Sequence, residues 1–117
     1  MRRAAAVDAN QSEIVKALRG IGATVSLTHR LGEGFPDICV GYHGRNILME
    51  IKDGSKPPSA RKLTKPEQAW HDAWRGQVVI VESVDDALVA IGVKARQLEN
   101  VRIEGVVLPD GRVIRGL

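Results

Sequence analysis

The sequence contains one cysteine, Cys39, and this scarcity excludes two kinds of small protein. One thiol cannot form an intramolecular disulfide, and it cannot supply the thiolate cluster of a structural zinc site. His29, His43 and His71 lie on different predicted elements without a shared ligand spacing, so they do not indicate a zinc site either. We therefore expect a protein of the reducing cytoplasm.

Long apolar runs are also lacking, and none approaches the roughly eighteen residues that a membrane span requires. The N-terminal segment turns polar and charged from Asp8 onward, before the apolar region of a signal peptide can form. Internal repeats and low-complexity tracts are absent as well. The sequence predicts a soluble protein with no membrane partner, and its 117 residues fit a single domain over residues 1–117.

Basic residues are in slight excess, and their distribution says more than their number. Seventeen Lys and Arg against fourteen Asp and Glu give a net charge of +3, which favours a polyanionic partner only mildly. Lys56, Arg61, Lys62 and Lys65 cluster in a segment with two prolines, which predicts an exposed basic loop. Such a loop could follow the phosphates of DNA, or it could be an ordinary solvated surface.

The first half of the chain predicts a helix followed by three strands. Residues 9–19 suit a helix with Asp8 as N-cap, Gln11 at the capping-box position and Gly20 as its stop. A weakly alternating strand over residues 23–28 follows. Two further strands over 37–42 and 45–52 form a hairpin that turns at His43-Gly44, since both are rich in Ile, Val, Leu and Met.

The second half predicts alternating helices and strands. Thr64 and Glu67 form a capping box that opens a helix ending at Gly76, and Trp70 and Trp74 on this helix are expected in the core. A strand, a helix capped by Ser83 and a C-terminal hairpin are expected over 78–81, 83–91 and 101–115.

The central hairpin carries the residues with chemistry. Side chains alternate along a strand, so Glu50 and Lys52 share one face. A two-residue turn at His43-Gly44 sets Asp37 directly opposite Glu50. Like charges whose Cβ atoms lie about 4.5–5.5 Å apart are destabilising unless something compensates them, and a divalent cation is a natural compensator.

Magnesium or manganese fits this pair of carboxylates. Mg²⁺ accepts oxygen ligands and keeps several waters, so Asp37, Glu50, the backbone carbonyl of Ile51 and a substrate phosphate suit it. Such a metal lowers the pKa of a bound water, while Lys52 can orient or deprotonate the nucleophile and offset developing negative charge. This combination predicts hydrolysis of a phosphodiester.

Pro36-Asp37 followed by Glu50-Ile51-Lys52 resembles the motif of the PD-(D/E)xK nucleases, which have the restriction-endonuclease-like fold. The resemblance extends over residues 8–91. It implies an α/β fold with an αβββαβ core, a central mixed four-stranded sheet flanked by helices, and a C-terminal β-hairpin beyond the core.

Within that superfamily the chain looks most similar to the VRR-NUC branch, including its small phage-type members, which are similar to Holliday-junction resolvases. The similarity lies in residues 34–37, 50–54 and 62–64. It implies a metal-dependent endodeoxyribonuclease that cuts branched DNA as a homodimer. It also implies Glu13 as a further metal ligand and Gln68 as a polar residue that contacts DNA.

Less specific interpretations stay open. Asp37 could cap a turn, Glu50 and Lys52 could be a surface pair, and Glu13 could be an ordinary exposed helix residue. The chain could also be a non-catalytic DNA-binding accessory module or a protein-interaction domain, whereas a Ser-His-Asp hydrolase lacks its nucleophile elbow. The C-terminal hairpin could extend its own sheet or form a protomer interface, through Val101, Ile103, Val106, Val107 and Leu108.

Overall fold

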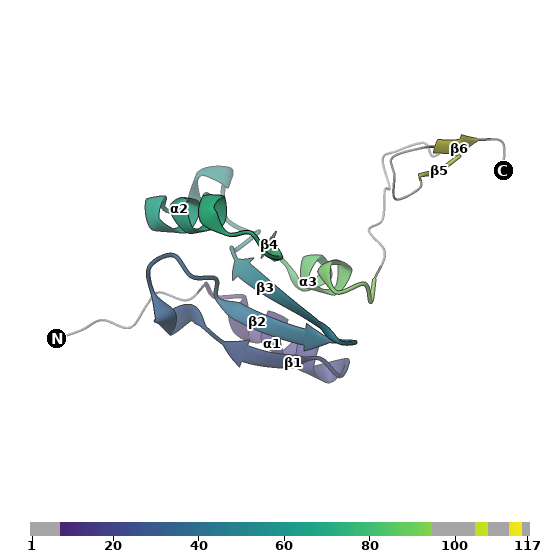
Figure 1. Ribbon diagram of the computed structural model, residues 1–117, viewed down its shortest axis with the longest axis horizontal. Helices are drawn as coiled ribbons and strands as arrows, with labels where there is room; N and C mark the ends of the chain where they lie inside the picture. Colours follow the sequence, from purple (N-terminus) through teal and green to yellow (C-terminus); the bar gives the residue numbers. More distant parts are fainter. Residues whose placement is uncertain (1–7, 95–104, 108–112, 116–117) are drawn as a thin grey trace.

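A mixed four-stranded sheet forms the centre of the protein in a computed structural model, which describes residues 8–94, 105–107 and 113–115 (Figure 1). The strands lie in the order β1-β2-β3-β4; β1, β2 and β3 are antiparallel, and β4 is parallel to β3. The α/β class and the mixed sheet are as predicted. The elements are α1 (Gln11–Gly20), β1 (Thr24–Leu27), η1 (His29–Leu31), β2 (Ile38–Tyr42), β3 (Arg45–Ile51), η2 (Pro58–Ala60), α2 (Lys65–Ala73), β4 (Val78–Val81) and α3 (Val84–Ala90).

The β2–β3 hairpin has the predicted register. Tyr42 pairs with Arg45 and Ile38 pairs with Met49, which leaves His43 and Gly44 as the turn. Both turn residues have positive φ, +49° and +77°, as the tightest hairpin turns require. This turn fixes which residues of the two strands face each other.

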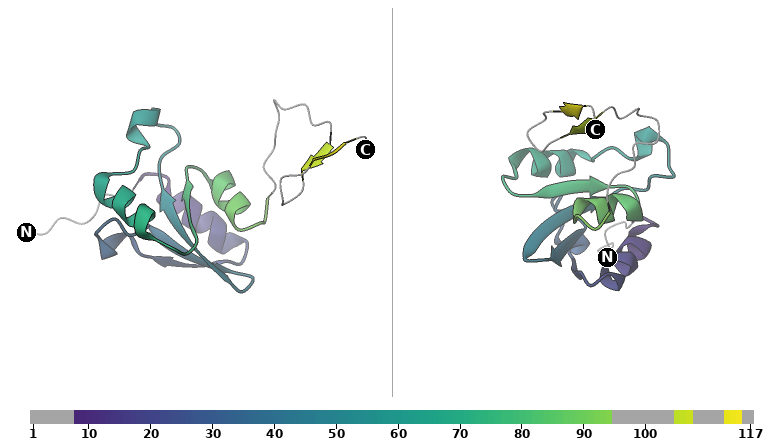
Figure 2. Two further views of the ribbon diagram at one scale, coloured as in Figure 1. Left: turned by 45° about the horizontal axis from the view of Figure 1, so that its top comes forward. Right: turned by 90° about the vertical axis from the view of Figure 1, so that its right-hand side faces the viewer.

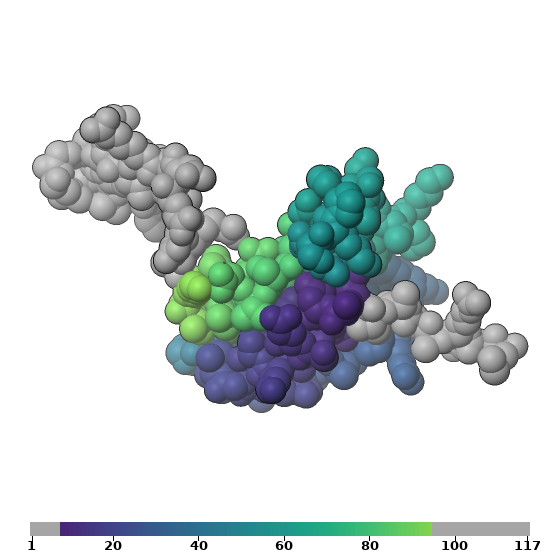
Figure 3. Space-filling model, turned by 180° about the vertical axis from the view of Figure 1, so that it is seen from behind, coloured from purple at the N-terminus to yellow at the C-terminus, as the bar shows by residue number. Residues whose placement is uncertain are grey.

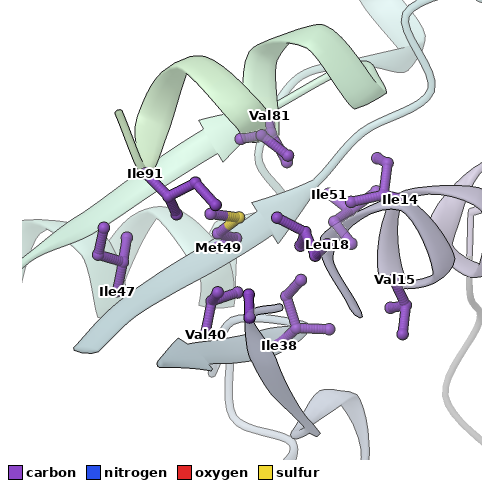
Figure 4. Packing of buried hydrophobic residues seen from close by; sticks show 12 residues of the cluster. Ile14, Val15, Leu18, Ile38, Val40, Ile47, Met49, Ile51, Val81 and Ile91 are labelled. Carbon is purple, nitrogen blue, oxygen red and sulfur yellow. The ribbon is translucent and has the colours of Figure 1, made fainter. Parts of the chain in front are cut away.

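One face of the sheet is covered by α1 and α3, which lie side by side in the view from behind (Figure 3). Met49 and Ile51 of β3 point toward Ile14 and Leu18 of α1, and all four side chains are fully buried (Figure 4). Truncating one such side chain to alanine costs about 2–5 kcal/mol. The alternate residues of β2 and β3 therefore face away from this core.

The start of α1 differs from the prediction. The N-cap is Asn10 rather than Asp8, and the Asn10 amide donates to the backbone carbonyl oxygens of Lys52 at 3.1 Å and Glu82 at 3.2 Å. Gln11 is not in a capping box but is the first, buried residue of the helix. Tertiary contacts explain the difference, because the side-chain amides of Asn10 and Gln11 bond to distant parts of the chain instead of capping the helix.

The helix α2 begins as predicted, with a capping box between Thr64 and Glu67. It ends at Ala73, before the predicted Gly76. The Trp70 ring contacts Phe35 edge-on at 5.3 Å and Trp74 stacks on Trp70, but Trp70 is only partly buried and Trp74 is 40% exposed. Neither ring belongs to the core, so the predicted core position is wrong for both. The cause is that α2 packs on the Gly34–Phe35 loop and lies apart from the layer of α1 and α3 (Figure 2).

The predicted C-terminal hairpin is present as two short strands, β5 (Gly105–Val107) and β6 (Val113–Arg115), which pair antiparallel with Val106 opposite Ile114. They form a sheet of their own, separate from β1–β4, so they do not extend the central sheet. The predicted turn at residues 109–111, together with Val101, Ile103 and Leu108, lies outside the described residues. None of the helices within the described ranges has the length and apolar character needed to cross a membrane.

Candidate catalytic site

Asp37 and Glu50 meet where β2 and β3 begin to diverge. Asp37 lies one residue before β2, beyond the Ile38–Met49 pair at which the ladder ends, and its side chain contacts the Glu50 carboxyl. Its backbone N–H donates to the Met49 carbonyl oxygen at 3.0 Å, and its carboxylate Oδ2 accepts from the Ile51 backbone N–H at 2.7 Å. The Asp37 side chain thus accepts a backbone N–H of β3 where the ladder ends, and this hydrogen bond holds the Asp37 carboxylate against β3.

Glu50 is a carboxyl group enclosed by the fold, with only 2% of the residue exposed. Burial, together with a hydrogen bond to the Asp37 side chain and repulsion from its charge, raises the pKa of Glu50 to about 10. Its Oε1 atom is buried without a hydrogen-bond partner among the described residues. At neutral pH and without a cation, Glu50 therefore holds a proton beside Asp37.

Lys52 follows β3 and is 8% exposed. Its ammonium Nζ donates to Glu67 Oε1 on α2 at 2.7 Å. Burial lowers the pKa of Lys52, but the hydrogen bond and charge of Glu67 outweigh this effect and leave the pKa raised. Lys52 is consequently a cation over the whole neutral range.

The site fits a divalent cation that keeps part of its hydration shell. The adjacent Asp37 and Glu50 carboxyl groups, including the unpartnered Oε1 of Glu50, provide oxygen donors, and Ile51, next along β3, is the predicted carbonyl ligand. No group of three or more His, Cys, Asp or Glu side chains that could hold a metal ion occurs in the described part of the chain. Mg²⁺ is bound in proteins through one or two carboxylates plus waters and substrate phosphate, so the two carboxylates suffice for it.

Glu13 and Gln68, the two residues implied by resemblance alone, do not join Asp37 and Glu50. Glu13 is exposed on α1 and lines a separate cleft with Arg61 and Glu82. It is absent from the charges that act on Glu50, which are Asp37, Glu67 and Lys52. Gln68 is exposed on α2, where its amide donates to Asp72 at 2.8 Å.

Gln11 is the buried polar residue of α1, although its sequence position predicted only a capping box. Gln11 is 4% exposed, its Nε2 lies 3.3 Å from His29 Nδ1, and its Oε1 has no partner among the described residues. Gln11 shares its helix face with Ile14 and Leu18, whereas Glu13 points about 200° away from Gln11 around the helix axis. Extending the apolar periodicity of this helix by one turn would have identified Gln11 as inward-facing.

The basic loop begins directly after Lys52. Two of its four cations are engaged within the chain: Arg61 donates to Glu82 at 3.1 Å, and Lys56 lies 3.8 Å from the Asp8 carboxylate. Lys62 and Lys65 are exposed and form no ion pair with any residue that the structure describes. They are the cations most available to an external phosphate.

The fold and this cluster together define an α/β domain in which a buried glutamate lies beside a partly exposed aspartate and a buried lysine, at one end of a mixed sheet. Comparison with protein-family models, curated proteins and solved structures finds no match for the chain. The geometry of the site is therefore the basis for assigning a function.

Proposed function

We propose that this protein is a metal-dependent deoxyribonuclease of the PD-(D/E)xK type that hydrolyses phosphodiester bonds in DNA with Mg²⁺ or Mn²⁺. The observation that carries the proposal is the contact between the Asp37 and Glu50 carboxyl groups, with Glu50 and the nearby Lys52 both buried. A buried carboxyl beside a second carboxylate costs stability in a free protein unless it serves a ligand, and perturbed carboxyls of this kind concentrate at functional sites.

Each residue has a distinct part in this chemistry. Asp37 and Glu50 would hold the cation together with the Ile51 carbonyl, and Glu50 would release its proton to solvent on doing so. When bound, the cation supplies a more acidic water and neutralises charge on the phosphate. Lys52 offers its ammonium N–H groups to the negative charge that develops on the phosphate oxygens. Because its pKa is raised, Lys52 serves as a donor and not as the base.

The exposed cations next to the site supply the contact with DNA. Lys62 lies just before α2 and Lys65 is the first residue of α2, the helix whose Glu67 binds Lys52, so they are suited to phosphates flanking the scissile bond. Contacts of this kind carry no base specificity. Preference for branched DNA and action as a homodimer belong to the proposal through the resemblance to the VRR-NUC branch.

The test is cleavage of labelled branched, duplex and single-stranded DNA by the full chain, with and without Mg²⁺ and Mn²⁺. Asp37→Ala, Glu50→Ala and Lys52→Ala are each expected to abolish cleavage while thermal melts stay cooperative. Glu13→Ala is the matched control, because Glu13 is an exposed carboxylate that does not join the pair, and it should keep wild-type activity.

Three results would overturn the assignment in different ways. DNA binding without cleavage under any metal would make the chain an accessory DNA-binding module. Absence of DNA binding at moderate salt would favour a protein-interaction domain. Unchanged metal affinity by calorimetry in both Asp37→Ala and Glu50→Ala would remove the metal from this site.

A further inference from the structure

Glu67 joins two parts of the protein through a single atom. Its Oε1 accepts a hydrogen bond from the Lys52 ammonium at 2.7 Å and another from the Thr64 backbone N–H at 2.8 Å. The Glu67 backbone N–H in turn donates to the Thr64 hydroxyl at 3.3 Å. The capping of α2 and the location of the Lys52 ammonium therefore depend on the same carboxylate.

The Lys52 contact is not required by helix capping. A capping box needs only the reciprocal bonds between Thr64 and Glu67, and these are complete without a lysine. The contact between Lys52 and Glu67 is nonetheless sheltered from solvent, since the two side chains are 10% and 20% exposed. Ion pairs sheltered from solvent are screened far less than surface pairs.

The helix that presents Glu67 is itself held in place near Asp37. The backbone of Pro66 and Glu67 lies so close to Gly34 that a Cβ atom there would meet the Glu67 nitrogen at 2.8 Å. Phe35, two residues before Asp37, packs edge-on against Trp70 of the same helix. The loop leading to Asp37 thus also fixes the carboxylate that receives Lys52.

A lysine side chain has a flexible four-carbon stem, so its ammonium needs an external partner to occupy one place. We propose that Glu67 is a positioning residue that holds the Lys52 ammonium on the Glu50 side of β3, where the scissile phosphate binds. This role rests on the proposed nuclease function. In this role Glu67 contacts neither DNA nor metal, and it acts on the reaction only by holding Lys52.

Two substitutions in the full chain separate positioning from capping. Glu67→Gln keeps an oxygen that can accept from the Thr64 N–H but removes the charge that binds Lys52. Thr64→Ala removes the hydroxyl half of the capping box and leaves both bonds to Oε1 intact. With Mg²⁺ and labelled DNA, Glu67→Gln should lower kcat by about ten- to a hundredfold, as misplacement of a catalytic group does. KM should stay within about twofold, and Thr64→Ala should keep kcat despite a lower melting temperature.

A second measurement does not depend on DNA cleavage. A lysine ammonium held in a sheltered ion pair exchanges its protons slowly, so its ¹H–¹⁵N signal should be visible for Lys52 in the wild type and in Thr64→Ala. The signal should disappear in Glu67→Gln, with the backbone spectrum still that of a folded protein.

The outcomes are distinct. An unchanged kcat together with a retained Lys52 signal in Glu67→Gln overturns the positioning role, as does a Thr64→Ala variant that loses as much kcat as Glu67→Gln. If the wild type cuts no DNA but the signal behaves as expected, the nuclease proposal fails and the structural control of Lys52 by Glu67 stands.

Discussion

Glu50 is an ionisable residue in β3, and its sequence neighbours Met49 and Ile51 are fully buried. Folding removes water from this carboxyl, and Asp37 opposes its ionisation further. The charged form is therefore more costly in the folded protein than in the unfolded chain.

This leads to a prediction for the pH dependence of stability. In the unfolded chain Glu50 ionises near pH 4.5, whereas in the folded protein it keeps its proton to about pH 10. Between these values the folded state binds one proton more, so stability should fall as pH rises, by at most about 1.4 kcal/mol per pH unit. Below pH 4.5 both states are protonated and the effect ends.

Thermal melts from pH 5 to 9 with a chelator present test this dependence. The Glu50→Gln variant should lack most of the decline and be more stable than the wild type at the alkaline end. Added Mg²⁺ should stabilise the wild type and not the variant, because only the folded ionised pair binds the ion. Parallel curves for the two proteins would show that Glu50 does not hold the proton.

At the scale of elements, the contact between the Gly34 loop and α2 determines how the two halves of the site meet. Gly34 has φ of +82° and no room for a Cβ atom beside the α2 backbone. Gly34→Ala should displace α2, lower the melting temperature and remove most cleavage, because Glu67 moves with the helix. Gly20→Ala is the control, since a Cβ there meets nothing within 4 Å. Equal stability of the two variants would show that α2 tolerates displacement from this loop.

The basic loop makes a prediction for DNA binding. Because Arg61 and Lys56 have partners within the chain, Lys62 and Lys65 should account for most of its phosphate contacts. The Lys62→Ala, Lys65→Ala double variant should lower the slope of log affinity against log salt by about 0.9 per lost contact, equally for all sequences. Extending it to Lys56→Ala and Arg61→Ala should add little. Unchanged affinity and slope in the quadruple variant, measured by fluorescence anisotropy, would exclude the loop from DNA binding.

Short-range patterns were sufficient for the elements and for the acidic pair. The turn at His43-Gly44 sets the β2–β3 register as far as Ile38 and Met49, because a hairpin register follows from its loop length, and the next residues, Asp37 and Glu50, are then in contact. The Lys52–Glu67 contact was not predictable in this way: it depends on where α2 docks, which no local pattern specifies. The exposure of Trp74 has the same cause, since its i, i+4 spacing with Trp70 is correct for a helix face but does not tell what covers that face.

At the scale of the whole molecule, β5 and β6 form a sheet apart from the central one, which leaves their role in assembly open to test. We predict a homodimer that cuts a four-way junction by paired nicks, because one chain supplies one site and twofold symmetry is the commonest way to supply two. Light scattering should show the dimer at micromolar concentration. A junction should be cut in preference to a linear duplex of matched sequence.

A chain shortened to end at Lys94 separates the hairpin from the site. It should keep the described core, whose buried residues run from Gln11 to Ile91, and it should be a monomer if the hairpin forms the interface. A full-length monomer that cuts linear duplex as readily as the junction would contradict the dimer prediction. It would leave the metal-dependent cleavage itself unaffected.

The order of the strands also bears on how the protein forms during synthesis. Strands β1, β2 and β3 are consecutive both in the chain and in the sheet, whereas β4 reaches β3 only after α2 has been made. Pairings between neighbours in sequence close short loops and form early, while a parallel crossover forms late. As the chain leaves the ribosome, we expect the hairpin that brings Asp37 and Glu50 together to form before β4 joins the sheet. If the acidic pair binds a divalent cation as proposed, the cation site would then form before Glu67 could hold the Lys52 ammonium.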